Sequence, residues 1–272
     1  MEFSFEPSRV LPLFDTHAHY TDDRFSTEID GGKDTVLAAL LSQNVRHIVN
    51  AGTNINSSRE CIAMAERYPA LYATAGIHPG DINSDDDIET VMNELRVLLS
   101  HPKVRALGEI GLDYHYDEPP RDVQTAWFRR QLELARETKI PVVIHDREAH
   151  GDIMDILREY PDVIGEFHSF SASAEIARQL VNRGWYISFS GVITFKNAAR
   201  LAEIVPTVPL DRVMIETDAP YLTPVPYRGK MNHSGMMEYT AARAAELYGI
   251  STEEFCRHAY ENACRFFGVE EK

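Results

Sequence analysis

The stretch RDVQTAWFRRQLELARETKIPVVIHD, residues 121–146, contains the helix-to-strand step that decides the fold. Apolar residues recur at helical spacing through 121–138, and Pro141 then opens a short apolar strand, PVVIHD at 141–146. A second apolar run, VRALGEIG at 104–111, precedes the helix. Two strands joined through a helix predict a parallel β-α-β unit.

The same alternation extends in both directions along the chain. Eight apolar runs rich in Val, Ile, Tyr and Phe predict strands at 11–19, 45–52, 71–78, 104–111, 141–146, 163–170, 185–191 and 212–219. Segments with helical spacing predict helices at 33–43, 56–67, 85–99, 121–138, 149–159, 173–183, 197–204, 235–248 and 252–266. Ser251, with Glu254 three residues later, predicts a capping box at the start of the last helix.

Eight such units predict an α/β protein with a (β/α)8 TIM-barrel fold, which typically takes about 250 residues. We expect a single domain over residues 1–272, with extra helices at its C-terminal end, because no Gly/Ser-rich linker divides the sequence. An open doubly wound sheet is the alternative, although that fold usually has fewer units.

Composition and charge exclude several classes of protein. The chain has 272 residues, of which 44% are hydrophobic and 25% charged, so it is neither a disordered chain nor a coiled coil. Its 42 acidic and 27 basic residues give a net charge of −15, which excludes a nucleic-acid binder with one broad basic face. An enzyme whose cleft holds cations is still allowed, since a bound metal can be the largest local charge.

The compartment is predicted from what the sequence lacks. No run of 18 apolar residues is present, so we expect no membrane partner, and the first 15 residues do not resemble a secretory signal. The three cysteines, Cys61, Cys256 and Cys264, contain no C-x-x-C pair. Buried thiols in a reducing cytoplasm explain them best, so we expect a cytoplasmic protein. We expect no stable protein partner.

Residues at the ends of the predicted strands suggest metal chemistry, because strand ends share one mouth in a barrel. His17 and His19 alternate along the first strand and so project to the same side, where both can bind one metal ion. Glu109 lies in the apolar fourth strand, where a carboxylate is costly unless it is paired or bound to metal. A salt bridge to an arginine is the alternative for Glu109.

Further candidates follow the other strands. The fifth and sixth end in His145 and His168, the eighth contains Glu216 and Asp218 on one predicted side, and His78 follows the third. Any one histidine could be structural. Taken together, five strand ends supply a set that suits two divalent cations sharing a carboxylate bridge. This set is His17, His19, Glu109, His145, His168 and Asp218.

Seven ordered blocks between residues 14 and 268 resemble the TatD family of metal-dependent deoxyribonucleases. They are FDTHAH, AGIHPGD, GEIGLDYHY, VIHDREA, ISFSGVITFKNA, ETDAPYLTPVPYRGK and ENACRFFG. The resemblance implies a (β/α)8 barrel and a divalent-metal hydrolase that acts on phosphodiesters. An exonuclease on single-stranded DNA is the activity we favour, with DNA or an oligonucleotide as the substrate.

The resemblance also implies roles for individual residues. His17 and His19 correspond to the first-strand ligands, Glu109 to the carboxylate that bridges two metals, and Asp218 to the eighth-strand ligand of the first metal. His145 and His168 correspond to ligands of the second metal. Asp218 is also the natural group to orient the attacking water, and His78 is a candidate for phosphate binding or for protonating the leaving oxygen. A hydrogen bond that shapes the loop before Pro79 is the structural alternative for His78.

Two segments depart from the family pattern. The sixth strand continues as His168-Ser169-Phe170-Ser171-Ala172, where the family usually has glycine at the last position. The usual Arg-Asn-Glu-Pro is replaced by Met231-Asn232-His233-Ser234, so its glutamate and proline are missing. These changes affect the expected fit of the substrate and leave the expected metal ligands intact.

Four basic residues follow the fifth, seventh and eighth strands and are candidates for substrate binding, with ordinary surface charge as the alternative: Arg147, Lys196, Arg228 and Lys230. The metals are expected to be Mg²⁺, Mn²⁺, Co²⁺ or Zn²⁺. Alternative functions on the same site are an amidohydrolase or an aminoacyl-tRNA ester hydrolase. Many amidohydrolases have a modified lysine where this chain has Glu109. A non-catalytic, metal-stabilised binding protein is a further alternative.

Overall fold

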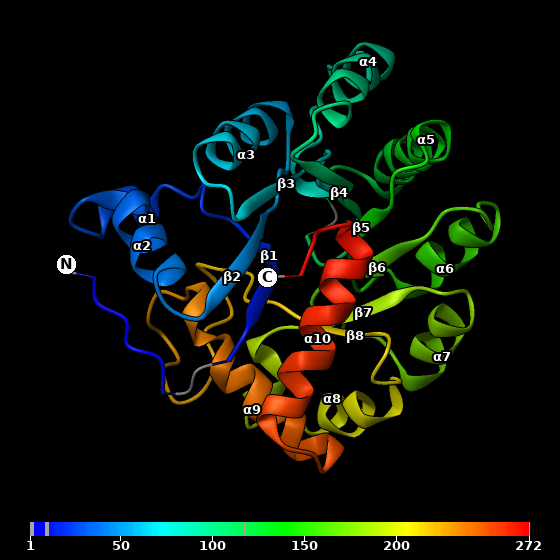
Figure 1. Cartoon of the computed structure of the whole chain (residues 1–272). Helices are drawn as coiled ribbons and strands as arrows, with labels where there is room; N and C mark the ends of the chain where they lie inside the picture. Colours follow the sequence, from blue (N-terminus) through cyan, green and yellow to red (C-terminus); the bar gives the residue numbers. More distant parts are fainter. Residues whose placement is uncertain (1–2, 9–10, 117, 272) are drawn as a thin grey trace. The chain divides into compact units, whose positions relative to one another are not determined.

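The structure is a computed structural model that describes residues 3–8, 11–116 and 118–271. Within these ranges, eight strands hydrogen-bond in chain order, from β1 to β8, and each strand is followed by at least one helix (Figure 1). This is the strand order and alternation of a (β/α)8 barrel, as the sequence predicts. The strands are β1 (Leu13–Ala18), β2 (Val45–Asn50), β3 (Leu71–Ala75), β4 (Val104–Asp113), β5 (Val142–Arg147), β6 (Gly165–Phe167), β7 (Tyr186–Phe189) and β8 (Val213–Ile215).

All nine predicted helices are present, and two of them follow β8 as expected. The described residues also contain a short helix that the sequence did not predict, α1, which has four residues and no side-chain cap hydrogen bond. The helices are α1 (Arg24–Thr27), α2 (Gly32–Leu41), α3 (Ile55–Arg67), α4 (Ile88–Leu99), α5 (Arg121–Thr138), α6 (His150–Arg158), α7 (Ala174–Asn182), α8 (Ala199–Ile204), α9 (Met237–Tyr248) and α10 (Thr252–Phe267). Both β6 and β8 are shorter than predicted, with three residues each.

The described chain forms two compact units. Unit 1 comprises Met1–Asn50 and Ile187–Lys272, and unit 2 comprises Ala51–Tyr186. The expectation of a single domain over the whole chain stays a prediction. Among the described residues, no helix is long and apolar enough to cross a membrane.

Unit 2 is built on the parallel pairs β3–β4, β4–β5 and β5–β6. The residues Val142–Ile144 of β5 are fully buried, as expected for a strand covered on both faces. Helix α5 packs against β4 and buries Trp127, Phe128 and Leu132 from one face. Burying a side chain of this size contributes roughly 1.5–3 kcal/mol, so this face holds α5 in place.

Unit 1 contains the parallel pairs β1–β2 and β7–β8. Helix α10, drawn in red in Figure 1, packs against β8 and β1. Its Asn262 side chain donates hydrogen bonds to the carbonyls of Leu210 and Val213, which anchors the helix to the start of β8. The helix is capped by Ser251, whose side chain accepts from the Glu254 N–H. This is one half of the predicted capping box, and the hydrogen bonds of the described residues do not include the return bond from the Glu254 side chain.

Candidate metal centre

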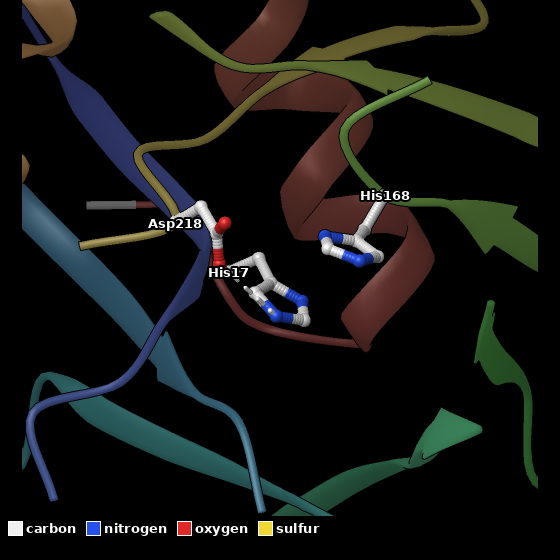
Figure 2. A group of neighbouring side chains, drawn as sticks. All are labelled: His17, His168 and Asp218. Carbon is white, nitrogen blue, oxygen red and sulfur yellow. Dashed lines mark ion pairs between the residues drawn. The ribbon is translucent and has the colours of Figure 1, made fainter. Parts of the chain in front are cut away.

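Unit 1 brings together three of the predicted ligands, His17, His19 and Asp218. The Nε2 atoms of the two histidines are 3.2 Å apart, and Asp218 Oδ1 is 3.1 Å from His19 Nε2. The same oxygen is 3.9 Å from His17 Nε2, an ion pair drawn in Figure 2. His17 is fully buried, whereas the Asp218 side chain is 17% exposed. The alternation predicted for His17 and His19 is therefore present.

Backbone hydrogen bonds place Asp218 beside β1. The Asp218 N–H donates to the His17 carbonyl at 2.9 Å, and the His19 N–H donates to the Ala219 carbonyl at 2.7 Å. Strand β8 ends at Ile215, and Asp218 has a left-handed backbone with φ of 56°. Aspartate tolerates this conformation better than most residues. The turn, rather than strand alternation, therefore directs the Asp218 carboxylate toward the two histidines.

The Asp15 side chain fixes this turn through hydrogen bonds to Thr217. Its Oδ2 accepts from Thr217 Oγ1 at 2.6 Å and its Oδ1 accepts from the Thr217 N–H at 2.9 Å. Asn232 Nδ2 donates to the Thr217 carbonyl at 2.9 Å, so Thr217 is gripped from two sides. Burial raises the pKa of Asp15 to about 7, although the hydrogen bonds from Thr217 oppose the shift. Asp15 Oδ1 also accepts from the His17 N–H at 3.4 Å, so Asp15 connects the residue before Asp218 to the backbone of His17.

Unit 2 brings together the other predicted ligands, Glu109, His145 and His168. His145 Nδ1 is 2.8 Å and His168 Nε2 is 2.9 Å from the same carboxylate oxygen, Glu109 Oε1. The two ring nitrogens are 3.2 Å from each other. The Glu109 side chain is only 4% exposed. Two imidazole nitrogens and a carboxylate oxygen that converge inside a protein form a donor set suited to a divalent metal.

His78 joins this second group from the end of β3. Its Nε2 is 3.6 Å from Glu109 Oε1, and its ring lies 4.3 Å from that of His145. One donor atom from each of these three residues lies within 4.8 Å of the other two, which is close enough to hold one ion. His78 Nδ1 accepts from the Gly80 N–H at 3.0 Å, so the predicted loop-shaping hydrogen bond is present. Burial lowers the pKa of His78 to about 4, and because Nδ1 accepts from Gly80, the neutral ring carries its proton on Nε2, the atom that faces Glu109.

Asp113 is a site residue that the sequence reasoning missed. Its Oδ2 lies 3.2 Å from His145 Nε2, while His145 Nδ1 faces Glu109. Burial by itself raises the pKa of Asp113, but the hydrogen bond to His145 and the charge around it outweigh burial and lower the pKa below its usual value. The same contacts raise the pKa of His145 against the effect of burial. An aspartate behind a histidine is the usual arrangement for orienting a metal ligand. The available signal was its place in GLDYHY, at the carboxyl end of β4.

Glycines allow β4 to present Glu109 at this position. A Cβ on Gly108 would lie 2.7 Å from the Val143 side chain, and a Cβ on Gly111 would lie 1.9 Å from the His145 carbonyl oxygen. Gly111 also has a φ of 149°, which disfavours any side chain. The backbones of β4 and β5 can therefore approach closely on both sides of Glu109.

The four predicted substrate-binding residues are all exposed, on segments that follow the predicted strands: Arg147, Lys196, Arg228 and Lys230. Arg147 lies over the Tyr116 ring at 5.0 Å in unit 2, and Arg228 lies over the Phe195 ring at 3.7 Å in unit 1. Two exposed tyrosines accompany the clusters. Tyr116 is 69% exposed, and Tyr221 is 47% exposed with its ring 6.2 Å from that of His19.

Histidine and carboxylate clusters at strand ends of a (β/α)8 fold define a metal-dependent hydrolase, and comparison with known proteins agrees. Residues 14–268 match the model of the TatD related DNase family, and the chain belongs to this family. It is 39% identical over 259 residues to the metal-dependent hydrolase YabD of Bacillus subtilis, covering 94% of this chain and 99% of that protein. It is 35% identical over 260 residues to the metal-dependent hydrolase YcfH of Escherichia coli, covering 95% and 96%.

Solved structures show the same fold. The crystal structure of YjjV, a TatD homologue from Escherichia coli, superimposes with a TM-score of 0.87 at 27% identity, over 96% of this chain and all of that one. A TatD family hydrolase from Entamoeba histolytica gives a TM-score of 0.82 at 24% identity, over 96% of this chain and 99% of that one. The (β/α)8 fold class and the family predicted from the sequence are thus confirmed. The roles of the individual residues stay predictions.

Proposed function

We propose that this enzyme hydrolyses phosphodiester bonds in single-stranded DNA, as an exonuclease that uses two divalent metal ions. The observation that carries the proposal is the convergence of His145 and His168 on one oxygen of Glu109. A salt bridge to arginine, the alternative considered for Glu109, would not require two imidazoles at 2.8 and 2.9 Å. Membership of a family described as TatD related DNase supports the choice of substrate.

The ligands are proposed to act together because every strand of a (β/α)8 barrel ends at the same mouth. In this proposal His17, His19 and Asp218 would hold one ion and His145 and His168 the second, with the Glu109 carboxylate as a ligand shared by both. Imidazole and carboxylate donors suit Zn²⁺, Mn²⁺ and Co²⁺, and accept Mg²⁺ more weakly. Divalent ions bound there lower the pKa of water and neutralise charge on the phosphoryl oxygens.

The chain's own residues position the substrate and move the proton. Asp218 is the partly exposed carboxylate of its cluster, so it orients the attacking water and accepts its proton. Asp113 keeps His145 Nδ1 turned toward Glu109 by binding Nε2. The exposed residues Arg228 and Lys230 bind phosphates next to the scissile bond. His78 is neutral at pH 7 and its Nδ1 accepts from Gly80, so within this proposal its Nε2–H serves as a hydrogen-bond donor to a phosphate.

Substrate placement also draws on the exposed aromatic rings. Tyr221 lies beside His19 and under the Arg24 guanidinium at 4.3 Å, and its hydroxyl donates to Asp22 at 2.8 Å. A ring fixed in this way offers a face on which an unpaired base can stack, which contributes about 1–3 kcal/mol per base. The bases of single-stranded DNA expose their faces to such a ring, whereas the bases of a duplex are stacked on one another. A cytoplasmic location is part of the proposal, supported by three buried thiols.

The deciding experiment is a hydrolysis panel with the purified enzyme. After chelation, Mg²⁺, Mn²⁺, Co²⁺ and Zn²⁺ are added back singly, with labelled single-stranded DNA, RNA, an aminoacyl-tRNA and small amides as substrates. We expect chelation to abolish cleavage, and metal to restore release of mononucleotides from one end of the DNA. Full activity in protein shown to be free of metal would contradict the proposal. Faster turnover of the aminoacyl-tRNA or the amides would assign the alternative functions instead.

A further inference from the structure

A cavity in unit 1 is lined by residues other than the ligands of that unit. Its volume is about 620 Å³, in the range of small-molecule sites. It is bounded by the N-terminal segment 3–6, by helix α9 and by the inner side of the loop 227–233, which carries Arg228 and Lys230. The ligands His17, His19 and Asp218 do not line it. The family match begins at residue 14, so the N-terminal wall belongs to this chain and lies outside the family match.

Aromatic rings form much of the cavity wall. The rings of Phe3 and Phe5 meet His233 edge-on, with centroid distances of 5.1 and 5.3 Å. Tyr227 and Tyr239 form another edge-on pair at 5.2 Å. Such walls recognise flat, ring-containing ligands by stacking and edge contacts. The cavity therefore offers aromatic surface to a ligand that contains a ring.

His233, which lines the cavity, contributes the polar atom Nδ1. The residue is only 8% exposed, and its Nδ1 atom has no hydrogen-bond partner among the described residues. A buried polar atom without a partner costs about 1–3 kcal/mol, so a ligand that bonds to it gains affinity. Burial lowers the pKa of His233 to about 4, and the ring is neutral at pH 7.

Charge on the wall limits the ligand further. Three carboxylates, Glu6, Glu28 and Glu238, and one ammonium group, Lys230, line the cavity. The excess of negative charge repels a phosphate group and accepts hydroxyl or amino donors. Glu238 is held in place, since its Oε2 accepts from both the N–H and the hydroxyl of Ser8 at 2.9 Å.

We propose that this cavity is a second binding site that takes an uncharged nucleoside, with the base between the aromatic rings and hydrogen-bonded to His233 Nδ1. The sugar hydroxyls donate to the carboxylates of the wall. The choice of a nucleoside, among aromatic ligands, rests on the proposed action on DNA. Lys230 and Tyr227 line the cavity and also belong to the loop that is proposed to bind phosphates. A nucleoside in the cavity therefore holds that loop in one conformation.

The test measures binding rather than turnover. The metal-loaded enzyme is titrated with adenosine by calorimetry, with ribose as the ligand that lacks a base. We expect one adenosine per chain at micromolar to millimolar concentration and no binding of ribose. We also expect AMP to displace adenosine less well than inosine does, because of the acidic wall. Absence of adenosine binding, equal binding of ribose, or equal displacement by AMP would overturn the proposal.

Two variants locate the site. His233→Phe keeps a ring against Phe3 and Phe5 but removes Nδ1, and should weaken adenosine binding about tenfold. Gly235→Ala places a Cβ 2.5 Å from the Phe5 ring, so it should displace that wall and weaken binding as well. Gly151→Ala, where a Cβ meets nothing within 4 Å, and His101→Asn are the matched controls.

The variant results separate this proposal from the nuclease function. Unchanged adenosine affinity in both His233→Phe and Gly235→Ala, with folding confirmed by thermal unfolding, would contradict the cavity as the site. Asp218→Asn should bind adenosine like the wild type, because Asp218 does not line the cavity. Loss of DNA cleavage with adenosine binding retained would therefore count against the nuclease and not against this site.

Discussion

The two ligand clusters are built from the same residue types but differ in how they are held. In unit 2, Glu109 is buried and three imidazole nitrogens lie within 3.6 Å of one of its oxygens. In unit 1, Asp218 is partly exposed, and it stands in a turn fixed by backbone hydrogen bonds and by Asp15 through Thr217. The Glu109 carboxylate is enclosed by imidazoles, whereas the Asp218 carboxylate contacts two imidazoles and keeps part of its surface exposed.

This difference assigns different tasks to the two carboxylates. A buried carboxylate is stable only while positive charge or donors surround it, so Glu109 is suited to binding metal. A partly exposed carboxylate can meet a water and a substrate, so Asp218 is suited to moving a proton. The predictions below test this division, beginning with the largest expected effect.

Removing the charge of Glu109 should be the most damaging change. Glu109→Gln leaves His145 and His168 facing an amide, and we expect metal content to fall together with activity, by at least about 10³-fold in kcat if the bridge contributes several kcal/mol of charge stabilisation. Elemental analysis of the purified variant, beside a cleavage assay, checks this. Glu133→Gln, on the exposed face of α5, is the control. Wild-type metal content in Glu109→Gln would show that Glu109 is not the bridge.

The matching change in unit 1 should separate metal binding from catalysis. Asp218→Asn keeps an oxygen ligand but loses the proton acceptor, so we expect at least one metal to stay bound while kcat falls by about 10²-fold or more. The exposed Asp211, before β8, supplies the control Asp211→Asn. If Asp218→Asn lost all metal, the contrast drawn between the two carboxylates would disappear.

The residues behind the ligands should matter less than the ligands themselves. In Asp113→Asn the side chain keeps its shape, but its neutral amide oxygen stabilises a proton on His145 Nε2 less than the carboxylate does. We expect metal affinity to fall by about 10- to 100-fold, the usual range for such partners. Competition with a chromogenic chelator measures the affinity, and Asp122→Asn in the first turn of α5 is the control. Unaltered affinity would mean that packing alone orients His145.

The fold could be predicted from the sequence because apolar spacing and proline mark where the helices and strands begin and end. The helix at 121–138 and the strand that opens near Pro141 are found where the spacing and the proline place them. The ligand pair His17 and His19 was equally accessible, because β1 runs to Ala18 and alternation holds along it. Helix α1 was not predictable, since four residues without a cap carry no periodic signal.

The rest of the site depends on turns that composition does not reveal. His168 directly follows β6, as His19 directly follows β1, but Asp218 comes three residues after β8 ends, so strand alternation does not reach Asp218. The left-handed backbone at Asp218 sets its direction instead. Asp113 was missed because its role depends on contact with His145, 32 residues later in the chain.

The smallest effects should come from the exposed basic loop. Arg228 rests on the Phe195 ring, and Lys230 lies two residues further on, so both offer charge to phosphates without a broad basic face around them. If they and their neighbours neutralise two or three phosphates of a single strand, log affinity should fall against log salt with a slope near −2, at about 0.7 per phosphate. The double variant Arg228→Glu, Lys230→Glu should raise KM for an oligonucleotide severalfold. It should change the hydrolysis of a small phosphodiester much less, because that substrate needs only the metal ligands.

Reversing the charges of Arg178 and Arg257, which pair with Glu175 and Glu261 on the helix surfaces, controls for the change in net charge. A steep slope like that of a broad-faced DNA binder, or equal losses on both substrates, would show that this loop does not hold the strand.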